Sequence, residues 1–134
     1  MSSDISPELR QLVHHRAKNR CEYCLLPQSV TLHKHEPDHI IPRQHDGQTE
    51  AENLALACMR CNRYKGPNVG SFDPNSGDLV PFFNPRQQEW SAHFEFQGGV
   101  IHPLTAEARV TVKILRVNDP DRVSEREKLL QAGL

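Results

Sequence analysis

The sequence predicts a small α+β protein of one domain, on the basis of three observations. The chain has 134 residues, of which 37% are hydrophobic, so it can bury one modest core but is too short for two ordinary domains. Two pairs of cysteines, each with a two-residue gap, enclose strand-like runs in a central unit at residues 20–66. A helical pattern precedes this unit, and a hairpin and a further helical pattern follow it. We therefore expect a single domain, 1–134, with a core clamped by the cysteines and a C-terminal extension at 67–134.

The first expected element is an N-terminal helix at residues 6–19. Ser6 can cap its first turn, and Pro7 suits the first helical position because an N–H there would have no partner inside the helix. Apolar residues then recur at helical spacing and would form one buried side of the helix. These residues are Leu9, Leu12, Val13 and Ala17.

The central unit is expected to contain two strands and a short helical turn. The runs at 30–32 and 39–41 are rich in β-branched residues, and Pro42 ends the second run because proline cannot donate to a sheet. The pattern Thr49-x-x-Glu52 matches a capping box, in which two side chains satisfy free N–H groups at a helix start. It therefore predicts a helical turn directly after Thr49.

The extension is expected to contain a hairpin and then a helix. Strands at 93–96 and 100–102 flank the turn Gln97-Gly98-Gly99. The segment 106–117 lies between a capping threonine and a later proline, so we choose a helix, although its alternating hydrophobic residues leave a strand open. Aromatic side chains are expected to fill the core here, because this part of the chain has little else to bury. They are Phe82, Phe83, Trp90, Phe94 and Phe96.

The charge and the termini limit the classes of function. The formal net charge is −1 and the pI is about 6.7, so this is not a uniformly basic protein that coats nucleic acid. No apolar run approaches the roughly 20 residues that span a bilayer, and residues 1–4 lack the features of a signal peptide. We expect a cytoplasmic protein with no membrane partner. In that reducing compartment, the cysteines are better interpreted as metal ligands or free thiols than as disulfides.

The spacing of the cysteines favours a metal site. Cys21 and Cys24 form one pair, and Cys58 and Cys61 form the other. A two-residue gap lets both thiolates of a pair turn toward one point, and two pairs supply the tetrahedral four-sulfur shell that Zn²⁺ prefers. Buried thiols or a redox pair would account for one such pair but not for two. Because four sulfurs leave no open position, this four-cysteine zinc site would be structural.

The polar residues between and after the cysteine pairs form a further motif. Asp38-His39 is followed by Asn53 and then, directly after the second pair, by Asn62-x-x-Lys65. This order resembles the HNH endonuclease family, in the branch whose nuclease motif is supported by a four-cysteine zinc site. The downstream run resembles the extension of bacterial HNH proteins of similar length. The resemblance implies a ββα-metal active site and the hydrolysis of DNA phosphodiester bonds by a one-metal mechanism.

The residues of this motif suit that chemistry. Hydrolysis needs a deprotonated water and positive charge near the phosphate. His39 is the expected general base, because a neutral imidazole can take a proton near pH 7. Asp38 and Asn62 are the expected ligands of Mg²⁺ or Mn²⁺, which prefer oxygen. The resemblance implies that Asn53 holds the backbone presenting the base. The family often has a second histidine where this chain has Asn62, whose amide oxygen can still coordinate a hard ion.

One geometric difficulty concerns the neighbours Asp38 and His39. Adjacent residues of a regular strand point to opposite faces, so an undistorted strand cannot aim both at one phosphate. Pro37 precedes them, and proline marks an edge, a strand start or a bulge. We therefore expect the site at a strand end.

Several basic residues around the motif are candidates for DNA contact, or else form a solvated face. The DNA-binding candidates are Arg43, His45, Arg63 and Lys65. By contrast, His33 and His35 are expected to be polar surface residues. Any nucleic-acid contact must be local, because the chain as a whole is not basic.

Two functions remain open at this stage. The first is a metal-dependent DNA endonuclease, and the second is a non-catalytic zinc-knuckle module that binds nucleic acid or protein. A non-catalytic remnant has no need to retain all four motif residues, so the sequence favours the enzyme. These residues are Asp38, His39, Asn53 and Asn62. DNA is the expected partner, and the sequence does not decide whether a protein partner or a homodimer is also involved.

Overall fold

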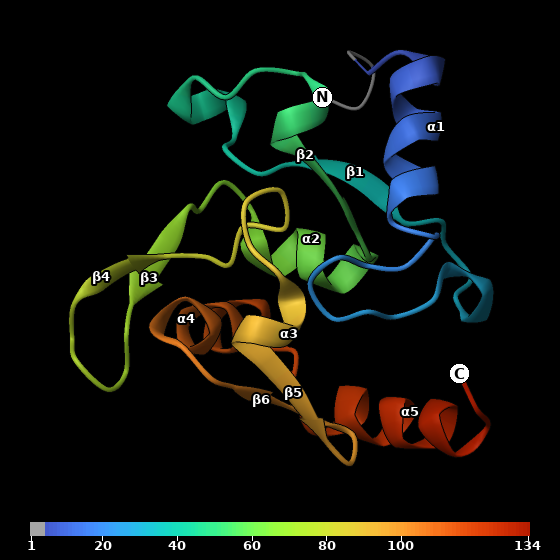
Figure 1. The fold of residues 1–134 in the computed structure, drawn as a ribbon, viewed down its shortest axis with the longest axis vertical. Coiled ribbons are helices and arrows are strands. Elements are labelled where there is room, and N and C mark those ends of the chain that lie inside the picture. Colours follow the sequence, from blue (N-terminus) through green and yellow to red (C-terminus); the bar gives the residue numbers. More distant parts are fainter. Residues whose placement is uncertain (1–4) are drawn as a thin grey trace.

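The computed structural model describes residues 5–134 (Figure 1). Residues 1–4, used above in the argument about a signal peptide, lie outside the described residues. The helices and strands are α1 (Pro7–Arg16), β1 (Glu36–His39), β2 (Leu54–Ala57), α2 (Met59–Lys65), β3 (Gly70–Phe72), β4 (Leu79–Pro81), α3 (Trp90–His93), β5 (Phe94–Gln97), β6 (Val100–Pro103), α4 (Ala106–Leu115) and α5 (Pro120–Gln131). Three 3-10 turns are η2 (Gln28–Val30), η3 (Arg43–His45) and η4 (Ala51–Asn53). The predicted α+β class is confirmed.

Helix α2 lies at the centre of the molecule. In Figure 1, the antiparallel pair β1–β2 and helix α1 lie on one side of α2, and α4 lies on the other. Helix α4 in turn contacts β3, β4 and β6, so it joins the two hairpins of the extension to the central unit. Within the described residues, no helix combines the length and apolar character needed to cross a membrane.

Helix α1 confirms the prediction for the N-terminal segment. The Ser6 hydroxyl accepts a hydrogen bond from the Leu9 N–H at 3.1 Å, which satisfies one free donor of the first turn. Val13 is buried and packs with Leu54 and Leu56 of β2. Leu12 is 44% exposed, so the buried side of the helix is narrower than the sequence pattern indicated.

The strand prediction for the central unit is partly wrong. No strand forms at 30–32, where the chain makes turn η2 and then leaves Leu32 fully exposed. The Thr31 hydroxyl lies 2.8 Å from the Gln28 carbonyl and 2.6 Å from that of His33, and such local bonds compete with sheet pairing. The second strand begins earlier than expected and ends at His39, which pairs with Leu54.

The capping box was also wrong. Turn η4 does follow Thr49, but its N-cap is Glu50, with no side-chain hydrogen bond. The Thr49 hydroxyl instead lies 2.8 Å from Nε2 of His39. The Thr49 hydroxyl therefore contacts the imidazole of His39 and does not cap a helix.

The extension contains the predicted hairpin and helix, together with elements that the sequence analysis missed. Strands β5 and β6 pair about a two-residue turn, Gly98-Gly99, with Gln97 inside the strand. The Thr105 hydroxyl caps α4 by accepting from the Ala108 N–H, so the strand alternative is excluded. The hairpin β3–β4, the short helix α3 and helix α5 were not predicted, and α3 contains His93, which was expected in the first strand of the hairpin. Pro120 was interpreted as a stop, whereas it begins α5, a position where proline is also favoured.

A single buried cluster connects the central unit with the extension. It contains Tyr23 and the four cysteines together with Phe83, Phe94 and Leu115 of the extension, which confirms much of the aromatic prediction. The rings of Phe83 and Phe94 meet edge to face with centroids 5.2 Å apart, and Trp90 lies 5.1 Å from Phe94. Phe96 is half-exposed and contacts Trp90. The extension therefore supports the central unit through shared core.

Candidate active site

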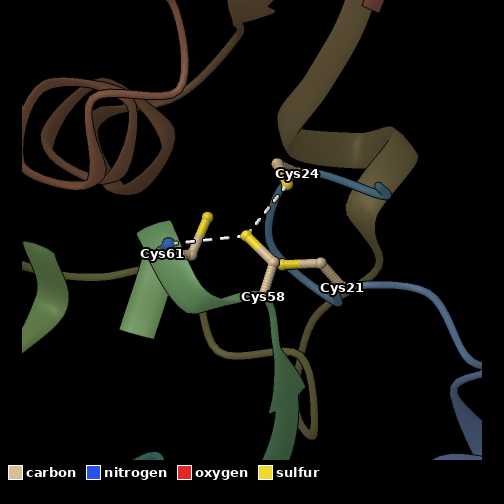
Figure 2. A group of neighbouring side chains, drawn as sticks. All are labelled: Cys21, Cys24, Cys58 and Cys61. Carbon is tan, nitrogen blue, oxygen red and sulfur yellow. Dashed lines mark hydrogen bonds between the residues drawn. The ribbon is translucent and has the colours of Figure 1, made fainter. Parts of the chain in front are cut away.

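The four cysteines form one buried cluster (Figure 2). Their Sγ atoms all lie within 4.8 Å of one another, and those of Cys24 and Cys58 are 3.7 Å apart. A tetrahedral ion with metal–sulfur bonds of roughly 2.3 Å requires sulfur–sulfur distances of about 3.8 Å. The arrangement therefore suits a metal ion, and none of the four is in a disulfide.

Local structure explains how these sulfurs converge. Cys58 is the N-cap of α2, and its sulfur accepts from the Cys61 N–H at 3.4 Å. The other pair lies in the loop after α1, where the Leu25 N–H donates to the Cys21 carbonyl and Leu25 has a positive φ of 63°. Each pair thus forms a tight turn that directs two sulfurs to one side.

Asp38 of β1 and Lys65 of α2 form an ion pair. The Asp38 carboxylate is mostly buried, and its Oδ2 lies 3.0 Å from Nζ of Lys65. The same ammonium group donates to the His39 carbonyl at 2.9 Å. Burial raises the pKa of Asp38, and the neighbouring Lys65 charge opposes that rise. Helix α2 therefore places a cation directly against β1.

The geometry of Lys65 is at odds with the predicted phosphate contact. This residue is 1% exposed, and its ammonium group points inward to two partners from β1. Arg43, His45 and Arg63 are exposed, as a DNA contact requires. The expectation for His35 was wrong, because the residue is buried and its Nε2 lies 2.8 Å from the Leu26 carbonyl.

His39 lies at the end of β1, as the geometric argument required. Burial lowers its pKa below the ordinary value of 6.5, which favours the neutral imidazole near neutral pH. Its Nε2 lies against the Thr49 hydroxyl, so the orientation of the ring is constrained. A neutral, oriented imidazole can act as a proton acceptor.

Asn53 ties down the backbone that follows His39. Its amide oxygen accepts from the Ile41 N–H, and its amide nitrogen donates to the carbonyls of Ile41 and Gln48, each at 2.9 Å. Its own carbonyl accepts from the Ile40 N–H at 2.8 Å. Gly47 is needed in the same loop, because a Cβ there would lie 1.6 Å from the Ile41 carbonyl oxygen.

Asn62 lies in α2, half-buried, three residues before Lys65. Residues three apart on a helix share one face, so Asn62 is on the same side of α2 as the Lys65–Asp38 pair. Helix α2 therefore carries Asn62 on the side where Lys65 pairs with β1, the strand that carries Asp38 and His39.

A cavity of about 620 Å³ opens beside this region, and it is lined by both parts of the chain. Ile40, Ile41 and Lys65 come from the central unit, and β4 with the following residues forms the opposite wall. The extension thus borders this cavity, whose lining includes Lys65 but not Asp38, His39 or Asn62.

Comparison with known proteins identifies the central unit. A family model described as HNH endonuclease matches residues 21–68. This segment is therefore similar to the HNH endonuclease family. A stretch of 52 residues is 44% identical to part of the CRISPR-associated endonuclease Cas9 of Corynebacterium diphtheriae. This stretch covers 38% of this chain but only 5% of that protein. No solved structure matches the chain.

The HNH segment contains all four cysteines and the candidate catalytic residues, whereas α1 and the elements from β3 onward lie outside it. Sequence reasoning missed two features that contact this segment. One is the inward pairing of Lys65, and the other is Arg122 of α5, which reaches the cysteine cluster. The family motif could have drawn attention to Lys65, but nothing in the sequence near Arg122 indicated its position.

Proposed function

We propose that this chain hydrolyses DNA phosphodiester bonds as a metal-dependent HNH endonuclease. The observation that supports this best is the Lys65–Asp38 ion pair, which joins α2, the helix that carries Asn62, to β1, the strand that carries Asp38 and His39. The family match of residues 21–68 also supports this reaction class. The activity of the whole Cas9 relative is not transferred, because the match covers only a small part of that protein.

The carboxylate of Asp38 and the amide oxygen of Asn62 would hold Mg²⁺ or Mn²⁺. Two protein ligands suffice, since such an ion keeps several waters and takes oxygens from phosphate. The ion supplies the positive charge that the transition state of phosphate ester hydrolysis requires. Lys65 acts here as a positioning residue, because its charge keeps the buried Asp38 carboxylate ionised and oriented.

His39 takes the proton from the attacking water. With Nε2 engaged by the Thr49 hydroxyl, Nδ1 is the nitrogen left to accept it. Asn53 keeps the base in place through its bonds to the backbone of 40–48. DNA phosphates would be contacted by Arg43, His45 and Arg63, which are exposed. Lys65 would not contact DNA, because it is buried.

The cysteine cluster would hold a structural Zn²⁺. Four thiolates fill its shell, so the ion would contribute to folding and not to hydrolysis. We also propose a cytoplasmic location, where reducing conditions keep the four thiols available as ligands.

Cleavage of supercoiled plasmid tests the proposal. The zinc-loaded protein is incubated with Mg²⁺ or Mn²⁺, beside an EDTA control, and His39→Ala is compared with His33→Ala, which changes an exposed histidine. We expect His39→Ala to lose roughly 10²- to 10⁴-fold in rate with its zinc content unchanged. Full activity in His39→Ala would exclude it as base, and intact plasmid with every ion would favour a non-catalytic binding module.

A further inference from the structure

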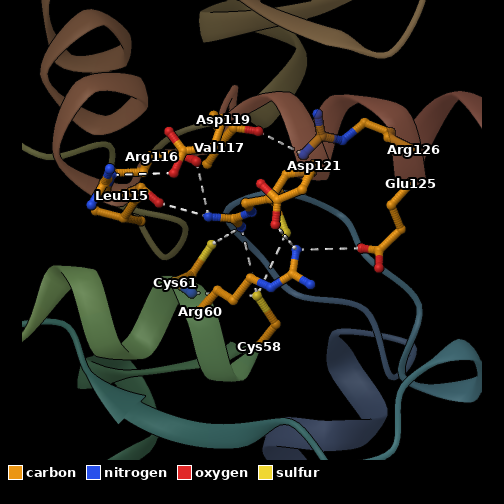
Figure 3. Close-up of polar contacts among 12 residues, drawn as sticks. Cys58, Arg60, Cys61, Leu115, Arg116, Val117, Asp119, Asp121, Glu125 and Arg126 are labelled. Atoms are coloured by element: carbon orange, nitrogen blue, oxygen red, sulfur yellow. Dashed lines mark hydrogen bonds and ion pairs between the residues drawn. The ribbon is translucent and has the colours of Figure 1, made fainter.

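Helix α5 covers the cysteine cluster, although it lies outside the segment that matches the HNH family (Figure 3). Arg122, in its first turn, is only 4% exposed. Its Nη2 lies 3.1 Å from Sγ of Cys61 and 3.9 Å from Sγ of Cys58. Its guanidinium group therefore makes direct contact with two of the four sulfurs.

The second terminal nitrogen of Arg122, Nη1, holds the guanidinium group in this position. Nη1 donates to the carbonyl of Leu115 at 2.7 Å and lies 3.2 Å from that of Arg116, where α4 ends in a left-handed residue. The turn between α4 and α5 thus presents backbone oxygens to one edge of the fork while the sulfurs occupy the other. A flexible surface arginine would not be held in this way.

A buried guanidinium requires a counter-charge. Burying an unpaired charge costs several kcal/mol. Among the described residues, the ion pairs formed with carboxylates do not include Arg122, and its polar contacts are carbonyl oxygens and sulfur. Four thiolates around a divalent cation leave a net charge of about −2. The cysteine cluster in its metal-bound form supplies the negative charge that Arg122 lacks elsewhere.

We propose that Arg122 is part of the metal centre, where it neutralises the thiolates of Cys58 and Cys61 and sets how firmly the chain retains its ion. This inference rests on the proposed zinc site but not on the nuclease activity. It gives the extension a role that the family match does not include, since α5 supplies a charge to a cluster built by the HNH segment. Groups that hydrogen-bond to metal ligands typically change metal affinity by roughly 10- to 100-fold.

Arg126 provides a matched control on the same helix. It is also a buried arginine of α5, and it donates to the carbonyls of Gly99 and Val117 at 2.6 and 2.9 Å. These hydrogen bonds hold α5 against the rest of the extension but do not reach a sulfur. Changing Arg126 therefore loosens the helix without removing a guanidinium–sulfur contact.

The experiment measures zinc release without DNA. Purified parent, Arg122→Met, Arg122→Lys and Arg126→Met are first analysed for bound zinc and for helical content, and transfer of zinc to a chromophoric chelator is then followed. We expect Arg122→Met to release zinc roughly 10- to 100-fold faster than the parent. Arg122→Lys, which keeps the charge but not the fork, should lie between them, and Arg126→Met should release at close to the parent rate.

Two results would overturn the inference. Release from Arg122→Met at the parent rate would show that the guanidinium does not stabilise the centre. Equal acceleration in Arg126→Met would show that docking of α5, and not the sulfur contact, controls retention. If Arg122→Met does not fold, zinc release from Arg122→Lys is compared with release from Arg126→Met. Faster release from Arg122→Lys would then support the sulfur contact, and equal release from the two variants would contradict it. A parent protein without bound metal would overturn the zinc site itself.

Discussion

The ammonium group of Lys65 lies 3.0 Å from the carboxylate of Asp38, and both side chains are buried between α2 and β1. This pair connects the helix that carries Asn62 with the strand that carries His39. It also explains how a carboxylate can remain ionised where burial raises its pKa. Stability and the proposed metal site therefore depend on the same contact.

Lys65→Met is expected to destabilise the fold by about 3 kcal/mol, because it leaves the Asp38 charge buried without a partner. The double variant Lys65→Met/Asp38→Asn removes both charges and should recover a large part of that loss. Urea unfolding of the zinc-loaded proteins measures both effects. A double variant no more stable than Lys65→Met would mean that the ion pair is not what holds β1 to α2.

Thr49→Val should slow cleavage by roughly fivefold, which corresponds to the loss of one hydrogen bond of about 1 kcal/mol. Without the hydroxyl at Nε2, the imidazole of His39 is free to rotate and to change tautomer. Single-turnover cleavage at saturating metal measures the chemical step. Thr31→Val, in the loop after η2, is the control, and equal slowing in both variants would remove the proposed role of Thr49.

Asn62 offers a test of the metal ligands. Asn62→His exchanges an amide oxygen for a nitrogen, so cleavage should persist while its preference moves toward Co²⁺, Ni²⁺ and Zn²⁺. Asn62→Ala should lose most activity with every ion, because one of two protein ligands is absent. Plasmid cleavage across a panel of divalent ions compares the three proteins. An Asn62→Ala protein that cuts like the parent in Mg²⁺ would exclude Asn62 as a ligand.

Asp73 gives a pH dependence that is independent of both metal sites. Arg109 donates two hydrogen bonds to the Asp73 carboxylate, from Nε at 2.8 Å and from Nη2 at 2.9 Å. These two bonds hold the pKa of Asp73 well below its usual value. A lowered pKa in the folded state adds stability above the unfolded pKa of about 3.9, and this contribution declines as the pH falls toward the folded pKa.

The free energy of unfolding of the parent should therefore exceed that of Asp73→Asn by the most near neutral pH. This difference between the two proteins should become smaller below about pH 4. Urea midpoints measured between about pH 3 and 7 test this. Asp78→Asn, which changes an exposed carboxylate in the same turn, is the matched control. A margin for Asp73→Asn that does not vary with pH would contradict the assignment.

The sequence by itself determined the features that depend on neighbours along the chain. The caps at Ser6 and Thr105 were predictable because each hydroxyl bonds to an N–H three residues later. The hairpin and the two cysteine pairs follow from equally short-range rules, although Gln97, expected in the turn, belongs to the strand. The order of the motif residues was sufficient to indicate the HNH family, which the comparison of residues 21–68 confirmed.

Tertiary structure decided which polar groups are buried and with which partner. Lys65 and Arg122 are ordinary basic residues of polar helices in the sequence, yet one pairs with Asp38 and the other with Cys61, 61 positions away. Residues 30–32 have strand-like composition but meet no partner strand, so local hydrogen bonds of Thr31 prevail. The free energy of a buried charge or of an unpaired strand depends on groups that approach through space, and separation along the chain carries no information about that approach.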